Sequence, residues 1–146
     1  MIETSIFPMQ RVFASLGLLK IDNIASGVGV IIFSPASKVA VGMHLLRAVP
    51  TGVNVLNPTY YAATAIPYVV EEIEKRKMTP PFSVAIAGGG AMMPTERGDV
   101  GAKIIAVVKE GLEKAGFQVK LEKIGGTRIR IMVLNIGEGK IKISYK

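Results

Sequence analysis

Two stretches dominated by Val and Ile in the first third of the chain predict a β-hairpin. Residues 26–34 combine glycine with branched apolar side chains, which is typical of a buried strand. Residues 34–37 contain a proline and two serines and predict a turn, and residues 38–44 predict the second strand. Because hairpin strands pair in register, we expect the start of the first strand to lie beside the end of the second.

Two helices are predicted after the hairpin. Asn57 is a good N-cap and Pro58 is tolerated at the first helical position, so a helix is expected over residues 59–77, with Pro67 either kinking it or separating its first turn. Asp99 predicts the N-cap of a second helix that ends at Gly116. The apolar residues of this second helix fall on one face: Val100, Ile104, Ile105, Val108 and Leu112.

Short apolar runs predict four more strands, at residues 82–87, 117–121, 127–134 and 140–144. Strands and helices do not alternate regularly along the chain. This order predicts an α/β sandwich, with two main helices packed on mixed or antiparallel β-sheet, rather than a doubly wound parallel sheet. The chain has 146 residues, 49% of them hydrophobic, so we expect a single domain spanning residues 1–146.

The mean hydropathy of +0.40 is high for a small soluble protein. No apolar run approaches the roughly 20 residues that a membrane span needs, so the surplus apolar surface is expected to meet a partner. The first residues include Glu3 and Pro8 and do not resemble a signal peptide. We therefore predict a cytoplasmic protein without membrane insertion.

The formal net charge of +7 indicates an anionic partner, which could be a nucleic acid, a membrane surface or an acidic protein. The basic residues are concentrated in residues 103–146. No run of five like charges occurs, and aromatic residues make up only 6% of the chain, too few for a base-stacking platform. We therefore do not expect a nucleic acid as the partner.

Candidate chemistry is sparse. The chain has no cysteine, which excludes disulfides, thiolate metal sites and thiol catalysis. His44 is its only histidine, so a metal site is not expected, and no cofactor is predicted. If His44 were a catalytic base, Ser26 and Ser34 would be the candidate nucleophiles.

The glycine run 88–90 permits two interpretations. A dinucleotide-binding loop needs G-x-G-x-x-G leading into a helix, but Met93 stands where the third glycine belongs. A tight backbone crossing that only glycine allows is the favoured interpretation.

Taken together, these patterns resemble the CheD family, the chemoreceptor glutamine deamidases of bacterial and archaeal chemotaxis. The resemblance covers nearly the whole chain and rests on the order and spacing of several motifs rather than on any one of them. They are ASGV at 25–28, VGMH at 41–44, IAGGGAM at 86–92, VGAK at 100–103, GGTRIR at 125–130, and residues 135–140.

The resemblance implies a site that this chain lacks in part. In that family a cysteine attacks a glutamine carboxamide, a downstream histidine activates the thiol, and an upstream threonine completes the site. His44 falls on the histidine position, whereas Gly27 occupies the cysteine position and Ile21 the threonine position. Residues 26 and 27 both fall in the predicted strand 26–34, where neighbouring side chains point to opposite faces, so Ser26 points away from His44 if Gly27 points toward it.

Three functions follow from these observations. The first is a catalytically inactive CheD-like binding module that engages the helical hairpin of a chemoreceptor or a CheC-type phosphatase. The second is an active hydrolase or deamidase using His44 with Ser26. The third is a nucleotide-binding protein using the loop Gly88–Gly90.

Overall fold

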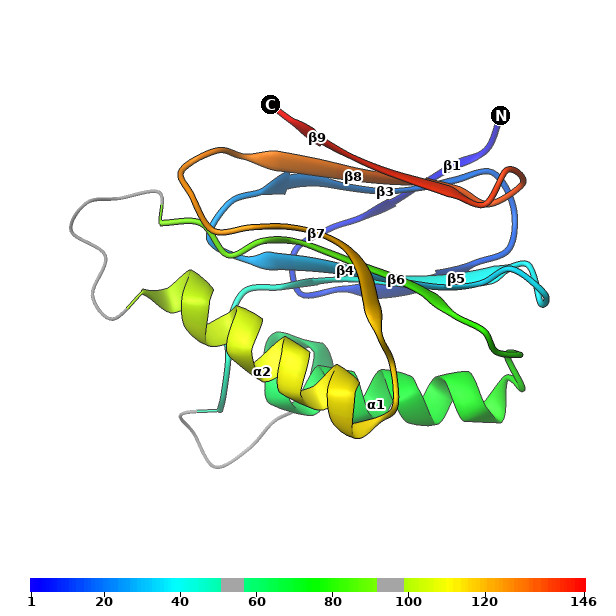
Figure 1. Ribbon diagram of the computed structural model, residues 1–146, viewed down its shortest axis with the longest axis horizontal. Helices are drawn as coiled ribbons and strands as arrows, with labels where there is room; N and C mark the ends of the chain where they lie inside the picture. The colour runs from blue at the N-terminus through cyan, green and yellow to red at the C-terminus, as the bar shows by residue number, and fades with distance from the viewer. Residues whose placement is uncertain (51–56, 92–98) are drawn as a thin grey trace.

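The chain forms a sandwich of two β-sheets, with two helices on the outer face of one of them (Figure 1). The computed structural model describes residues 1–50, 57–91 and 99–146. One sheet has the strand order β1-β3-β8-β9, comprising Glu3–Ile6, Leu18–Ile24, Arg130–Asn135 and Lys140–Tyr145. The other has the order β2-β5-β4-β6-β7, comprising Arg11–Ala14, Val39–Leu45, Val28–Ser34, Ser83–Gly88 and Val119–Ile124.

Both sheets are mixed, since β1–β3 and β6–β7 pair in parallel and the other pairs are antiparallel. The helices are α1 (Ala62–Lys75) and α2 (Val100–Lys114), preceded by a short 3₁₀ turn, η1 (Pro58–Tyr60). The predicted α/β sandwich with two main helices on mixed sheet is confirmed.

Strand β4 lies at the centre of the molecule, and all seven of its residues are buried. Val30 and Ile32 belong to the core between the five-stranded sheet and the helices. Ile31 and Phe33 belong to the core between the two sheets. This alternation follows from the two-residue period of a strand and gives the molecule two stacked cores.

The predicted hairpin is confirmed as β4–β5, with Val28 opposite Leu45 and Ser34 opposite Val39. One detail is wrong: the strand begins at Val28, and residues 25–27 form a bend between β3 and β4. The expectation that strand alternation turns Ser26 away from His44 therefore has no basis, because Ser26 is not in a strand.

The first helix begins later than predicted. The Asn57 side chain accepts from the Thr59 amide at 2.9 Å, so it caps η1 instead of α1. The first amides of α1, those of Ala62 and Ala63, donate to the carbonyl oxygens of residues 47 and 48 at 2.8 and 2.9 Å. Pro67 lies inside α1, which runs from Ala62 to Lys75, so Pro67 does not separate the first turn of this helix; the separate turn η1 ends seven residues before it.

The second helix agrees with the prediction. Asp99 caps it by accepting from the Ala102 amide at 3.1 Å, and Gly116 follows its end with φ +84°. Among the described residues, no helix has the length and apolar character needed to cross a membrane.

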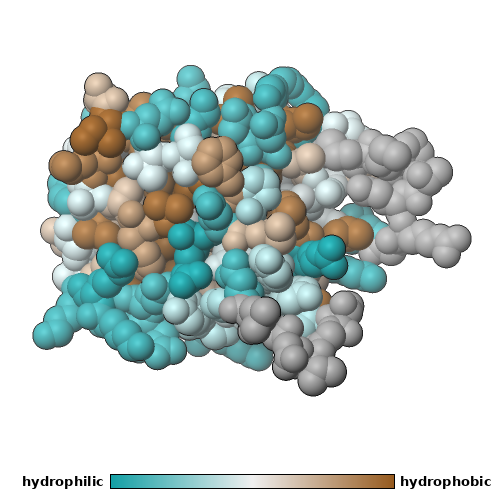
Figure 2. Space-filling model, turned by 180° about the vertical axis from the view of Figure 1, so that it is seen from behind, coloured by the Kyte–Doolittle hydropathy of each residue, from teal (hydrophilic) through white to brown (hydrophobic). Residues whose placement is uncertain are grey.

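The three N-terminal strands β1, β2 and β3 were not predicted. They carry or border several exposed apolar side chains, including Met1, Ile2, Phe7 and Leu16. Figure 2 shows hydrophobic surface mixed with hydrophilic surface on the face turned away from the viewer of Figure 1. Part of the high mean hydropathy therefore comes from exposed apolar residues that border these strands, and not from the buried cores.

Candidate functional site

The structure brings Gly27 and His44 together at one end of the five-stranded sheet. In the β4–β5 ladder His44 is opposite Gly29, and Gly27 lies two residues before Gly29 in the preceding bend. A β-carbon built on Gly27 would lie 3.3 Å from Nε2 of His44. A side chain at position 27 would thus contact the imidazole directly.

His44 is 2% exposed, and burial lowers the pKa of its imidazole from 6.5 to about 4. Its Nδ1 atom has no hydrogen-bond partner within the described part of the chain. Near neutral pH the ring is therefore uncharged, and it is a weaker base than an exposed histidine.

The space around Gly27 is narrow. The same β-carbon would lie 2.8 Å from Cδ2 of Leu46 and 2.9 Å from the carbonyl oxygen of Leu45. The Leu46 contact is with the end of a flexible side chain, whereas the Leu45 contact is with backbone. Any larger residue at position 27 would require both neighbours to shift slightly.

Ile21 lies deeper between the sheets and is completely buried. Its Cδ1 would lie 3.4 Å from a β-carbon on Gly29 and 3.7 Å from one on Gly42. Gly29 and Gly42 are each two residues along their strands from Gly27 and His44, respectively. Ile21 is therefore in the adjoining layer of the core, and it offers no hydroxyl group there.

The two serines that were considered as nucleophiles lie in different places. Ser26 is half-buried in the bend beside Gly27. Ser34 is at the opposite end of β4 from Gly27, and its hydroxyl donates to the Thr79 carbonyl at 2.5 Å while accepting from the Ser37 amide. Ser34 therefore belongs to the turn and is not near His44.

The glycine run 88–90 forms the tight backbone crossing that the sequence favoured. The amides of Gly89, Gly90 and Ala91 donate to the carbonyls of residues 27, 25 and 126 at 2.8, 3.0 and 2.9 Å. A β-carbon on Gly88 would lie 2.2 Å from the carbonyl oxygen of residue 27. These amides are already engaged, so the run does not present the free donors that a phosphate cradle requires.

One buried charged residue near this end was missed from the sequence. Arg130 is 4% exposed and donates to the carbonyls of Gly125 and Arg128, while the Gly125 amide donates to Gly88 at 2.9 Å. Arg130 thus secures the turn that contacts the glycine run. Its motif, GGTRIR, was visible in the sequence, but nothing there indicated that the second arginine is buried.

The best-defined pockets within the described residues are not lined by Gly27 or His44. Within the described ranges, no group of three or more His, Cys, Asp or Glu side chains is arranged to hold a metal ion. The site thus consists of an imidazole facing a glycine.

Comparison with known proteins identifies relatives over most of the chain. Residues 48–145 match the family model CheD, described as CheD chemotactic sensory transduction. The chain is 31% identical to the "Probable chemoreceptor glutamine deamidase CheD" of Desulforamulus reducens, over 91% of this chain and 84% of the relative. It is 30% identical to the "Chemoreceptor glutamine deamidase CheD" of Thermotoga maritima, over 87% of this chain and 81% of the relative.

A third relative and one solved structure are also similar to this chain. A "Probable chemoreceptor glutamine deamidase CheD" of Methanococcus vannielii is 32% identical over 82% of this chain and 80% of the relative. The crystal structure of the Bacillus licheniformis hypothetical protein YfiH superimposes with a TM-score of 0.47 and 11% identity, over 80% of this chain and 49% of that one. The match to the family model begins at residue 48 and so does not include Ile21, Gly27 or His44.

Proposed function

Since this chain belongs to the CheD family of chemotaxis proteins, we propose that it is a family member without deamidase activity that works by binding. Its ligand is the cytoplasmic helical hairpin of a chemoreceptor or a CheC-type phosphatase. One observation carries the proposal. Position 27, where a β-carbon would lie 3.3 Å from Nε2 of His44, is occupied by glycine, which has no side chain.

A nucleophile is required for the covalent route of this family. The chain contains no cysteine, and position 27 has no side chain on which an acyl intermediate could form. The low pKa of His44, about 4, also makes the imidazole a poor base for activating a hydroxyl group such as that of Ser26.

Binding does not depend on the missing thiol. The net charge of +7 suits an acidic protein surface, since complementary charge speeds association and selects partners. Relatives whose names describe them as chemoreceptor glutamine deamidases support a chemoreceptor as the ligand.

The direct test incubates the purified chain with receptor cytoplasmic fragments that contain substrate glutamines. Ammonia release and the glutamine-to-glutamate mass change are measured together with binding of the same fragments by calorimetry. We expect binding without turnover, and binding that weakens as salt is raised because part of the attraction is screened.

Two results would overturn this function. Turnover by the unmodified chain that disappears in Ser26→Ala would make Ser26 a nucleophile. Tight binding of a nucleotide that is lost in Gly89→Val would assign the glycine run 88–90 to phosphate recognition.

A further inference from the structure

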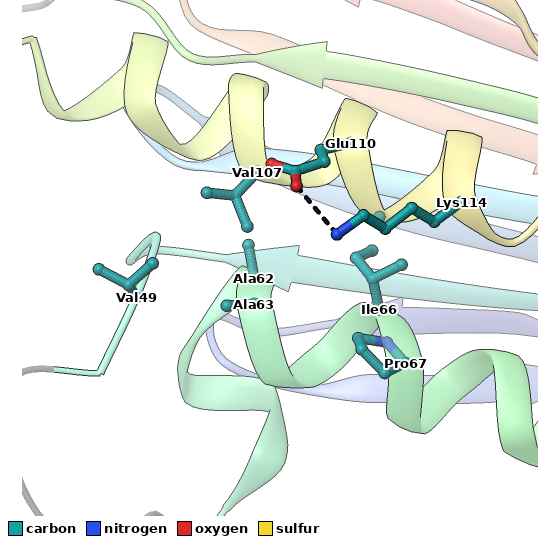
Figure 3. Close-up of a pocket in the computed structure, with 9 residues that line it drawn as sticks. Val49, Ala62, Ala63, Ile66, Pro67, Val107, Glu110 and Lys114 are labelled. Atoms are coloured by element: carbon teal, nitrogen blue, oxygen red, sulfur yellow. Dashed lines mark ion pairs between the residues drawn. The ribbon is translucent and has the colours of Figure 1, made fainter.

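A shallow apolar groove runs between α1 and α2 on the outside of the molecule, separate from the His44–Gly27 pair. Its central part has a volume of about 230 Å³ and lies between Ala63 and Pro67 of α1 and Val107 and Gly111 of α2. The ion pair of Glu110 with Lys114 on α2, at 3.0 Å, also lines it (Figure 3). It continues into hollows of about 330 Å³ and about 180 Å³ that share lining residues with it.

Small residues create the groove. A β-carbon on Gly111 would lie 2.9 Å from Cγ2 of Ile66, so the two helices approach closely at this point. On the α1 side Ala63 presents only a methyl group to the groove, while the neighbouring Ala62 is completely buried. The floor therefore consists of small side chains, with the charged pair Glu110–Lys114 beside it.

Exposed apolar side chains mark one end of the groove. Val49 is 52% exposed and Val100 is 41% exposed, and both line the hollow of about 180 Å³ at this end. Large apolar side chains exposed in a concave surface are typical of a binding site for another protein.

The two ends of the groove differ in charge. Arg47 and Lys103 line the end that contains Val49 and Val100, and neither is in an ion pair within the described part of the chain. The charged residues that line the opposite end are Glu71, Glu74 and Lys114, and Glu71 is paired with Lys75 at 3.0 Å. An occupant must therefore carry carboxylates where it meets Arg47 and Lys103.

From this shape and charge we infer that the groove between α1 and α2 docks an amphipathic helix of a partner protein. The helix packs a face of small apolar side chains against Ala63 and Gly111 and places acidic residues beside Arg47 and Lys103. The inference rests on the proposed binding function and locates it away from the pair at His44.

The groove is also connected to the pair. Leu46, which would contact a side chain at position 27, is adjacent to Arg47. The carbonyls of residues 47 and 48 in turn accept the first amides of α1. The segment 44–48 thus connects His44 to the start of α1.

The test uses two synthetic helical peptides of about four turns, enough to span the roughly 20 Å of α1. Both have the same Ala/Leu face, and one carries glutamates where the other carries lysines. Binding to the full chain is measured by fluorescence anisotropy at low and moderate salt. We expect the acidic peptide to bind at least about tenfold more tightly than the basic one, since like charges at a contact cost several kcal/mol.

Two variants are compared with a matched control. Arg47→Glu with Lys103→Glu removes the cationic end, and Ala63→Leu fills the floor without a change in charge. Lys140→Glu with Lys142→Glu makes the same charge change on exposed residues of β9 in the other sheet. Both groove variants should lose about tenfold or more in affinity for the acidic peptide, and the control less than about twofold.

The outcomes separate this inference from the proposed function. The groove is not the docking site if the control and the charge-reversed groove variant lose equal affinity for the acidic peptide. It is also not the docking site if Ala63→Leu binds the acidic peptide as tightly as wild type does. Receptor fragments that bind wild type and both groove variants equally would also overturn it while leaving the binding function in place. The acidic peptide could instead bind in the groove while neither receptor fragments nor CheC fragments bind to the chain. That result would overturn the proposed function and leave the groove as a docking site.

Discussion

A β-carbon on Gly27 would lie 3.3 Å from Nε2 of His44, although 17 positions separate the two residues in the chain. The β4–β5 hairpin produces this approach, because its register sets His44 opposite Gly29. The histidine is thus held in place beside a residue that has nothing for it to activate. Its burial has a consequence for stability.

The buried imidazole predicts a loss of stability in acid. The pKa of His44 is about 4 in the folded chain, against 6.5 as its ordinary value, so the unfolded chain binds more protons between these pH values. The free energy of unfolding should therefore be unaffected by His44 above about pH 7 and fall by up to about 3 kcal/mol as the pH drops from 6.5 to 4.

Urea unfolding of wild type and His44→Gln across this range measures the effect. The carboxylates titrate in both proteins, so the difference between their pH profiles isolates His44. An identical pH profile in the two proteins would contradict the buried, neutral state of the imidazole.

The glycines at the crossing predict a second set of stability effects. A β-carbon on Gly101 would lie 2.4 Å from the carbonyl carbon of Gly89, which is backbone and cannot turn aside. Gly101→Ala should therefore destabilise the chain by about 3 kcal/mol or more, even though alanine favours helix over glycine by about 1 kcal/mol.

Gly116→Ala is the matched control for this substitution. Gly116 has φ +84° and no atom within 4 Å of its β-carbon position, so only backbone strain of about 1–2 kcal/mol is expected there. Thermal unfolding of both variants measures how much each substitution destabilises the chain. A milder effect at Gly101 than at Gly116 would show that the crossing is not tight.

The elements predicted from the sequence are those with strong local signals. The hairpin has continuous Val and Ile runs, and α2 has both a cap at Asp99 and a single apolar face. The strands β1 and β2 were missed because each has four residues and only part of each is buried. Their positions are fixed by pairing with β3 and β5 rather than by local pattern.

The candidate site was predictable to a similar extent. The approach of Gly27 to His44 follows from hairpin register, but the burial of His44 depends on how the two sheets stack. Arg130 could not be identified as buried, because arginine is normally exposed and its acceptors are carbonyls of a turn. The groove was not predictable either, since it arises only where α1 and α2 cross.

The link between β2 and α1 gives a third stability prediction. Arg11 donates from Nε to Glu72 at 2.6 Å and from a terminal nitrogen to the buried Thr59 hydroxyl at 3.0 Å, and its guanidinium lies over the Tyr68 ring at 4.2 Å. Its side chain is only 24% exposed. Arg11→Ala should therefore lower the free energy of unfolding by about 1–3 kcal/mol.

Lys75 offers the control, because its ion pair with Glu71 has side chains that are 74% and 63% exposed. Lys75→Ala should leave the free energy of unfolding nearly unchanged, because an ion pair this exposed is screened by water. Denaturant titration of both variants provides the comparison. Equal effects would mean that the contacts of Arg11 add nothing beyond an exposed ion pair.

Restoring the nucleophile gives the last prediction. Gly27→Cys places a thiol beside His44, provided that Leu46 turns aside from the 2.8 Å contact and the Leu45 backbone shifts from the 2.9 Å contact. It should restore little turnover because Ile21 still fills the supporting position. Adding Ile21→Thr should raise the turnover of receptor glutamines above that of the single variant. Loss of a nucleophile costs orders of magnitude in rate, so the assay has room to show a gain.

Ser26→Cys is the matched control for this reconstruction, since it introduces a thiol in the same bend at a position that does not carry the family cysteine. The rate of iodoacetamide labelling against pH reports the thiol pKa in each variant. At position 27 the pKa should fall below the ordinary value of about 8.5 if the imidazole pairs with the thiolate, and it should rise again in Gly27→Cys with His44→Gln. The thiols at positions 26 and 27 could instead show the same pH dependence of labelling, with His44 present or replaced. That result would mean that the side chain at position 27 and His44 are too poorly aligned for chemistry. The family fold would then remain, but Gly27 alone would not account for an absence of turnover.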